Sequence, residues 1–362
     1  MLKLFAALLG AFASSVAFAQ AVPAGYPAEY AKTLEAAKKE GKVVIYSTLD
    51  SKAAAPLLRD FAAAFPDIKV EYNDINSTEL YNRFIAESAS GAGSADVIWN
   101  TAMDQSIRLV DQGLALTYAS PESKSLPAWA IYKGQAYGTT FEPVGFIYNK
   151  RLVPADEVPH DHAAFVKLLA TKMDKYKNRL TSWDIEKSGT GFLMATQDKK
   201  YLPQQAELVK LLAQANVRMF ASSGNMLEKV SSGELILGYN ALLAYANARA
   251  RKDPALGVVM PTDFAHVYSR VMFIGKGARD PSAAKVWIDY ILSKRGQAII
   301  AGEAGLYSIR EDVPGDQTAG ALNKQYGNVL KPIPLSAETA EYLDAKKRLE
   351  FLDAWKAMGS AQ

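Results

Sequence analysis

Short apolar runs alternate with helical segments along the first third of this chain, and this alternation most constrains its fold. Residues 43–46 read Val-Val-Ile-Tyr, an uninterrupted apolar run that is typical of a strand buried on both faces. Residues 53–65 follow with the spacing of apolar side chains that is typical of a helix. The order repeats, with strands predicted at 68–72 and 96–99 and a helix between them at 76–88. Such repetition predicts an α/β domain with a mostly parallel sheet.

The middle and the end of the chain carry further segments of the same kind. We expect strands at residues 144–148 and 235–239 and helices at 241–251 and 282–293. Residues 261–270 read as a polar stretch that precedes another strand. A chain of 362 residues is long enough for about two domains.

The N-terminus has the three parts of an export signal. Lys3 supplies the positive charge, residues 4–12 are apolar, and Ala17-Phe18-Ala19 reads as a cleavage site. The apolar run is too short to cross a bilayer core of about 30 Å. We therefore expect residues 1–19 to be a cleaved signal peptide. The mature protein is then expected in the periplasm, without a lipid anchor because no lipobox cysteine is present.

The composition excludes several kinds of site. The chain has no cysteine, so disulfides, thiolate nucleophiles and cysteine-based metal sites are excluded. The 41 lysines and arginines nearly balance 38 acidic residues without any basic run, so we expect no binding to nucleic acid. No nucleophile elbow, P-loop, dinucleotide-binding glycine motif or HExxH helix occurs. We expect no enzymatic activity; the alternative is a secreted hydrolase that uses the carboxylates of Asp50 and Glu142.

Five segments together carry a family resemblance. They are residues 40–47, 95–99, 145–150, 232–239 and 302–308. In sequence, order and spacing they resemble the bacterial periplasmic solute-binding proteins of the ferric-iron-binding type. The resemblance implies a type 2 periplasmic-binding-protein fold, in which two α/β lobes are joined by two crossover strands and close over a ligand.

The same resemblance implies the boundaries of the two lobes and the binding partners of the protein. Lobe one would comprise residues 24–138 plus 266–362, and lobe two residues 139–265. The implied partners are a small-molecule ligand and an ABC permease of the inner membrane, and we expect a monomer without a cofactor. A sensor that presents its closed form to a membrane receptor is the alternative use of the same fold.

Hydroxyl-rich and glycine-rich helix openings are candidate anion sites. They occur at residues 47–48, 76–78, 188–190 and 222–225. Free backbone N–H groups and the positive end of the helix dipole suit an anion there, although each opening is equally well explained as a simple N-cap. The turn at 188–190 resembles the family's anion-cradling turn, and Ser223 falls near a second anion contact of the family.

The iron ligands of the family are not retained. Where ferric relatives carry adjacent tyrosines, this chain has only Tyr239, followed by Asn240. The three histidines, His160, His162 and His266, lack the spacing of metal ligands. We therefore predict an anionic or zwitterionic ligand, such as a phosphonate, a phosphate ester or an organic acid, and keep ferric iron as the alternative.

Charged residues near the predicted crossovers admit two interpretations. Arg270, beside Tyr268, would either clamp an oxyanion through two hydrogen bonds or form a salt bridge between the lobes. Glu142 would either meet an amine or hydroxyl of the ligand or pair with a cation, and Asp50 poses the same choice. The complete set of predicted ligand-binding residues is Ser47, Thr48, Asp50, Thr78, Asn100, Thr139, Glu142, Ser188, Gly189, Thr190, Ser223, Tyr239, Asn240, Tyr268 and Arg270, with no metal ligand among them.

Overall fold

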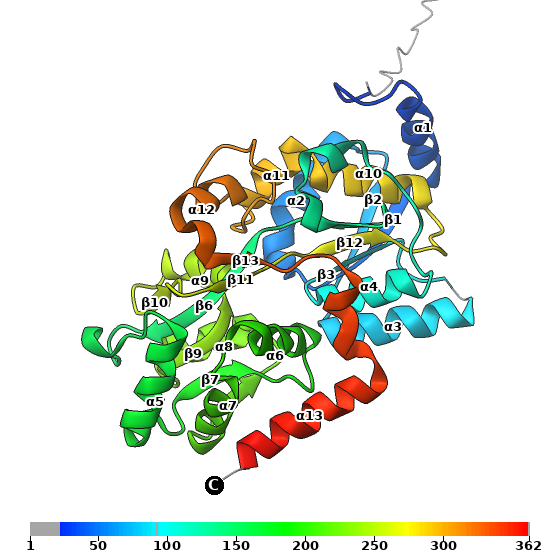
Figure 1. The fold of residues 1–362 in the computed structure, drawn as a ribbon. Helices are drawn as coiled ribbons and strands as arrows, with labels where there is room; N and C mark the ends of the chain where they lie inside the picture. The colour runs from blue at the N-terminus through cyan, green and yellow to red at the C-terminus, as the bar shows by residue number, and fades with distance from the viewer. Residues whose placement is uncertain (1–21, 92, 361–362) are drawn as a thin grey trace, which may run out of the picture.

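The computed structural model describes residues 22–91 and 93–360, which form two lobes, each built on its own sheet (Figure 1). The expected signal peptide, residues 1–19, lies outside the described residues. Within the described part of the chain, no helix is both long and apolar enough to cross a membrane. The two-lobed α/β architecture predicted from the sequence is confirmed.

The first lobe holds a six-stranded sheet. Its order is β2 (Lys69–Asp74), β1 (Lys42–Ser47), β3 (Val97–Asn100), β12 (Val271–Ile274), β5 (Ala136–Gly138) and β4 (Ile131–Tyr132). β1 pairs in parallel with β2 and β3, as the alternation of strands and helices predicts, whereas β12 is antiparallel to its two neighbours.

Helices cover this first sheet. They are α1 (Tyr30–Glu40), α2 (Ser51–Ala64), α3 (Ser77–Ser90), α4 (Met103–Asp111), α10 (Pro281–Leu292) and α11 (Lys294–Ala301), with the 3-10 turns η1 (Pro121–Ser125) and η2 (Ala128–Ala130). The core between sheet and helices contains a cluster of aromatic side chains among many aliphatic ones. Trp287 of α10 packs edge-on against Phe61 of α2 at 4.9 Å and against Trp99 of β3 at 6.4 Å between ring centroids. Edge-to-face packing at these distances is favourable and fixes the helices on the sheet.

The second lobe holds a seven-stranded sheet. Its order is β13 (Leu330–Pro332), β11 (Ala265–Tyr268), β6 (Glu142–Asn149), β9 (Leu237–Leu242), β7 (Leu180–Trp183) and β8 (Arg218–Phe220), and β10 (Leu256–Val259) also pairs with β6. Its helices are α5 (His162–Tyr176), α6 (Gly189–Tyr201), α7 (Gln205–Gln214), α8 (Ser223–Ser232) and α9 (Leu243–Ala250), with the 3-10 turn η3 (Ala155–Glu157). β7 is parallel to both β8 and β9, so the carboxyl ends of these strands share one edge.

Two extended connections join the lobes side by side. The chain leaves the first sheet after β5 and enters the second at β6, and it returns between β11 and β12. The backbone N–H of Thr139 donates to the Arg270 carbonyl at 2.9 Å, and the Arg270 N–H donates to Thr140 Oγ1 at 2.9 Å. The expected lobe boundary at 138/139 falls in the first connection, whereas that at 265/266 falls inside β11. The division into lobes by residue number stays a prediction.

The C-terminal segment spans both lobes a third time. After α12 (Ala319–Tyr326), η4 (Gly327–Val329) and β13, the short helix η5 (Ala337–Leu343) packs on α4 of the first lobe. The last helix, α13 (Ala345–Ser360), packs on α7 of the second lobe (Figure 1, red).

Candidate functional site

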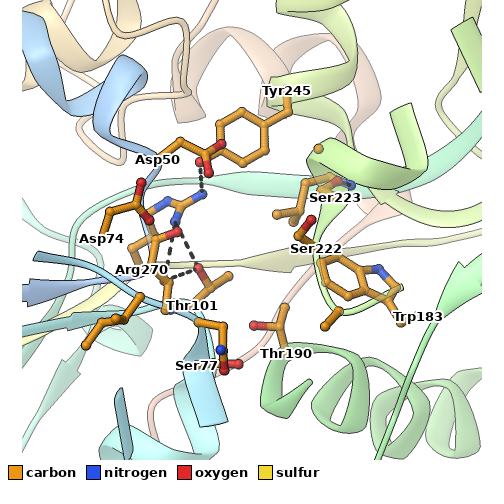
Figure 2. A pocket seen from close by; sticks show the side chains of 16 residues that line it. Asp50, Asp74, Ser77, Thr101, Trp183, Thr190, Ser222, Ser223, Tyr245 and Arg270 are labelled. Atoms are coloured by element: carbon orange, nitrogen blue, oxygen red, sulfur yellow. Dashed lines mark hydrogen bonds between the residues drawn. The ribbon is translucent and has the colours of Figure 1, made fainter. Parts of the chain in front are cut away.

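A polar pocket of about 150 Å³ opens between the two lobes (Figure 2). It is lined by Thr48, Asp50, Asp74, Ile75, Asn76, Ser77, Thr101, Trp183, Thr190, Ala221, Ser222, Ser223, Gly224, Leu242, Tyr245 and Arg270. The floor is buried and the rim is exposed. Thr101, Thr190, Ser223 and Arg270 belong to the buried part.

The ends of parallel strands bring these residues together. Thr48 follows β1, Asp74 ends β2, and Thr101 follows β3. In the second lobe, Trp183 ends β7 and Leu242 ends β9. Because the carboxyl ends of parallel strands lie at one edge of a sheet, residues far apart in sequence form a single crevice there.

Four helices, α2, α3, α6 and α8, begin at this pocket. The N-cap side chains that accept a backbone hydrogen bond are Asn76 (2.9 Å), Ser188 (3.1 Å) and Ser222 (3.4 Å). Each cap satisfies one N–H of its first turn, and the other N–H groups there have no partner within the helix. The converging positive ends of the dipoles favour an oxyanion in the pocket.

Arg270 lies at the buried floor, where protein groups surround its guanidinium. Its Nε lies 2.9 Å from Glu142 Oε1, and its Nη2 donates to Glu142 Oε2 at 3.3 Å and to the Tyr245 hydroxyl at 3.0 Å. Its Nη1 donates to the Thr48 carbonyl at 3.1 Å and to Thr101 Oγ1 at 3.0 Å. Both Nη groups therefore donate to the protein, whereas Nε is close enough to Glu142 for an ion pair but forms no hydrogen bond. Of the two interpretations of Arg270, the structure shows the salt bridge.

Glu142 does not line the pocket in this arrangement. Its side chain is fully buried, and Thr140 Oγ1 donates to its Oε1 at 2.7 Å in addition to the salt bridge. The pair of Arg270 and Glu142 carries no net charge, and the favourable electrostatic interaction with Glu142 raises the pKa of Arg270 above its usual range against the opposing effect of burial.

Two further carboxylates stand at the rim of the pocket. Asp50 and Asp74 are both exposed there. Desolvation by the surrounding protein raises the pKa of Asp50, and the positive charge of Arg270 opposes this shift. Asp74 Oδ2 accepts hydrogen bonds from the Ser51 N–H at 2.8 Å and the Ser51 hydroxyl at 3.1 Å.

Thr48, Asp50, Thr190, Ser223 and Arg270 are the predicted residues that line this pocket. Whether they contact a ligand stays a prediction. Six pocket residues are absent from the predicted ligand-binding set, although two of them, Ser77 and Ser222, belong to helix openings that the sequence marked as candidate anion sites. The six are Asp74, Ser77, Thr101, Trp183, Ser222 and Tyr245. For Asp74 and Thr101 a signal existed, because both stand at the carboxyl ends of predicted strands.

Some predicted residues support the pocket from behind. Ser47 Oγ accepts from the Leu49 N–H at 3.0 Å, and Asn100 Nδ2 donates to Gln105 at 3.2 Å. Thr139 Oγ1 accepts from the Trp99 indole at 2.8 Å. These side chains fix the backbone at the ends of β1 and β3 and in the first connection.

Others link the two lobes beside the pocket. The Gly189 N–H donates to Ser77 Oγ at 3.1 Å, and Thr78 Oγ1 donates to the Lys187 carbonyl at 3.0 Å. Ser188 caps α6 immediately before Gly189. The predicted turn at 188–190 therefore forms part of a direct contact between the lobes.

Tyr239, Asn240 and Tyr268 lie in a separate buried cluster. The Tyr239 hydroxyl and Asn240 Nδ2 both donate to Asp198 Oδ2, at 3.0 and 2.8 Å. Burial, and then the charge of Asp198, raises the pKa of Tyr239 well above its usual value. His266 Nε2 lies 3.0 Å from Asp198 Oδ1. The hydroxyl of Tyr268 is buried without a hydrogen-bond partner among the described residues.

Comparison with known proteins identifies the family and the fold of this chain. Residues 57–324 match the model of the bacterial extracellular solute-binding protein family. The substrate binding protein of an ABC transporter from Agrobacterium tumefaciens is 33% identical, with a TM-score of 0.84 over 88% of this chain and 94% of that chain. No curated protein matches the chain.

More distant structures share the fold. The periplasmic binding protein AfuA from Actinobacillus pleuropneumoniae, solved with fructose 6-phosphate, is 18% identical, with a TM-score of 0.70 over 89% of this chain and 99% of that chain. A ferric binding protein from Campylobacter jejuni is 17% identical, with a TM-score of 0.69 over 88% of this chain and 99% of that chain. The extent of the family match and the identity to the Agrobacterium structure show that this chain belongs to the bacterial extracellular solute-binding proteins.

Proposed function

We propose that this chain is the periplasmic solute-binding component of an ABC importer and that it captures a small organic oxyanion between its lobes. The observation that carries the proposal is the convergence of four helix N-termini on one polar pocket with a buried floor. Backbone N–H groups and the hydroxyls of Thr190 and Ser223 are suited to a phosphonate, phosphate ester or carboxylate. The similarity to an ABC-transporter substrate binding protein and to AfuA with its sugar phosphate supports the same class of function.

Ferric iron is the second candidate, because the fold is shared with a ferric binding protein. The described residues argue against it. They include no group of three or more histidine, aspartate or glutamate side chains placed to hold a metal ion. Tyr239, the one tyrosine at the expected iron position, donates to Asp198 and does not line the pocket.

A hydrolase that uses Asp50 and Glu142 is also disfavoured. General acid–base work requires both carboxyl groups to reach the substrate. Glu142 is instead enclosed by Arg270 and Thr140 beneath the floor.

Thermal unfolding of the ligand-free protein tests the oxyanion proposal. The panel is ethylphosphonate, 2-aminoethylphosphonate, propionate, β-alanine and ferric citrate. A compound at a hundred times its Kd stabilises the folded state by about 2.7 kcal/mol, so at least one oxyanion is expected to raise Tm. Thr190→Val should reduce that shift, because it removes a pocket hydroxyl at nearly constant volume. Thr171→Val, which removes an exposed hydroxyl bonded within α5, should not.

A rise in Tm with ferric citrate alone, accompanied by a phenolate-to-iron absorption band, would contradict the oxyanion proposal and favour iron.

A further inference from the structure

We infer that the pocket selects a zwitterion, in which a cationic ammonium group faces Asp50 and Asp74 while an oxyanion faces Thr190, Ser222 and Ser223. This inference rests on the proposed function and names the ligand class of the same site. We call the first group of residues the acidic side and the second the hydroxyl side. Figure 2 shows them on opposite sides of the pocket.

The acidic side has two carboxylates, and the described residues that line the pocket include a single cationic side chain. That side chain belongs to Arg270. Its charge is balanced by Glu142, at 2.9 Å from Nε, and both of its Nη groups donate to protein groups. Asp50 and Asp74 therefore have no further cationic side chain of the pocket lining to pair with. A purely anionic ligand would be repelled there, whereas an ammonium group would be attracted.

The hydroxyl side offers donors without any carboxylate. Ser222 and Ser223 begin α8, and Thr190 lies in the first turn of α6, so both helix dipoles present their positive ends. The Thr190 side chain is only 5% exposed, and it lines the pocket. Its hydroxyl points into the pocket in Figure 2. A hydroxyl in this position can donate a hydrogen bond to an oxyanion in the pocket.

The pocket dimensions favour a compact molecule that spans both sides. Its volume of about 150 Å³ is below the ~300–1,000 Å³ that is usual for drug-sized ligands. A short chain with an ammonium at one end and a phosphonate or carboxylate at the other meets both sides at once. Neither an isolated oxyanion nor an isolated amine does.

Isothermal titration with two matched pairs tests this inference. The pairs are 2-aminoethylphosphonate with ethylphosphonate, and β-alanine with propionate, each differing by one ammonium group. In the pair that binds, the ammonium compound should bind at least about tenfold more tightly, as is typical of a charge-assisted hydrogen bond. In the double variant Asp50→Asn, Asp74→Asn this ratio should fall toward one, because the amides keep the shape and remove the charge.

The matched control is Asp353→Asn, an exposed carboxylate on α13 outside the pocket, which should leave the ratio unchanged. Urea unfolding of each variant verifies that the fold is intact. Equal binding of both members of a pair, or a ratio that persists in the double variant, would overturn the zwitterion inference and leave the oxyanion proposal standing. Binding by none of the four compounds would overturn both.

Discussion

Asp104, at the start of α4, is a buried carboxyl group that the binding function does not use. Its Oδ1 has no hydrogen-bond partner among the described residues. Burial raises its pKa to about 7, against the lowering effects of the backbone N–H groups of α4 and the charge of Arg348. It also contributes to the raised pKa of Tyr268, after burial and Asp198. The folded protein therefore binds a proton here that the unfolded chain releases near pH 4.

Because Asp104 binds this proton only in the folded state, we expect the protein to lose stability as pH rises. Between about pH 4 and pH 7 the folded state holds more protons than the unfolded state at this site, so the free energy of unfolding falls as pH rises. Above about pH 7 both states have released this proton, so the free energy of unfolding no longer changes with pH at this site. Asp104→Asn removes this titrating group. The free energy of unfolding of the variant, measured relative to that of the native protein, should therefore rise by up to about 4 kcal/mol from pH 4 to pH 8.

Urea unfolding at several pH values measures this difference. The exposed Asp353→Asn serves as the control and should follow the native protein at every pH. A difference between Asp104→Asn and the native protein that is constant with pH would show that Asp104 does not hold the proton.

At the scale of helices and strands, the sequence predicts the parallel part of the first sheet well. Strands expected at 43–46, 68–72 and 96–99 are observed as β1, β2 and β3, and helices expected at 53–65 and 76–88 as α2 and α3, within about two residues at nearly every end. These elements are predictable because their apolar periodicity is a local property.

β11 was not predicted, because its burial is not a local property of the sequence. It lies within residues 261–270, which read as polar, and its His266 and Tyr268 are buried only because the partner strands and Asp198 surround them. The same limit applies to the site. Helix openings are visible in the sequence. The partners of the Arg270 guanidinium are not, because they come from distant segments that only packing brings together; they are Glu142, Thr48, Thr101 and Tyr245.

The C-terminal helix α13 offers a prediction at the same scale. Phe351 is 6% exposed and packs edge-on against Phe192 of α6 at 5.5 Å, whereas Leu349, two residues earlier, is 60% exposed. Phe351→Ala should lower the free energy of unfolding by about 3–5 kcal/mol, because it leaves a cavity between α13 and α6. Leu349→Ala should change it by no more than about 0.5 kcal/mol.

Chemical unfolding of the two variants measures both values. Equal, small effects would mean that α13 does not contribute to the stability of the second lobe.

For the whole molecule, the contacts between the lobes beside the pocket connect ligand binding to closure. Ser77 and Thr78 at the start of α3 bond to Gly189 and Lys187 at the start of α6. Such bonds exist only when the lobes are together, so they stabilise the closed state relative to an open one. Thr78 does not line the pocket, which makes its contribution separable from direct ligand contact.

Thr78→Val should therefore weaken ligand binding without altering any pocket group. Loss of one hydrogen bond is worth about 1 kcal/mol, which corresponds to about a fivefold weaker Kd if the bond forms only on closure. Titration with the tightest binder of the oxyanion panel measures Kd, and small-angle scattering measures whether the ligand-bound radius of gyration stays larger in the variant. Thr171→Val, whose hydroxyl bonds within α5, is the control and should behave as the native protein. An unchanged Kd in Thr78→Val would mean that this bond is equally present with and without ligand, and that closure is governed instead by the pocket residues themselves.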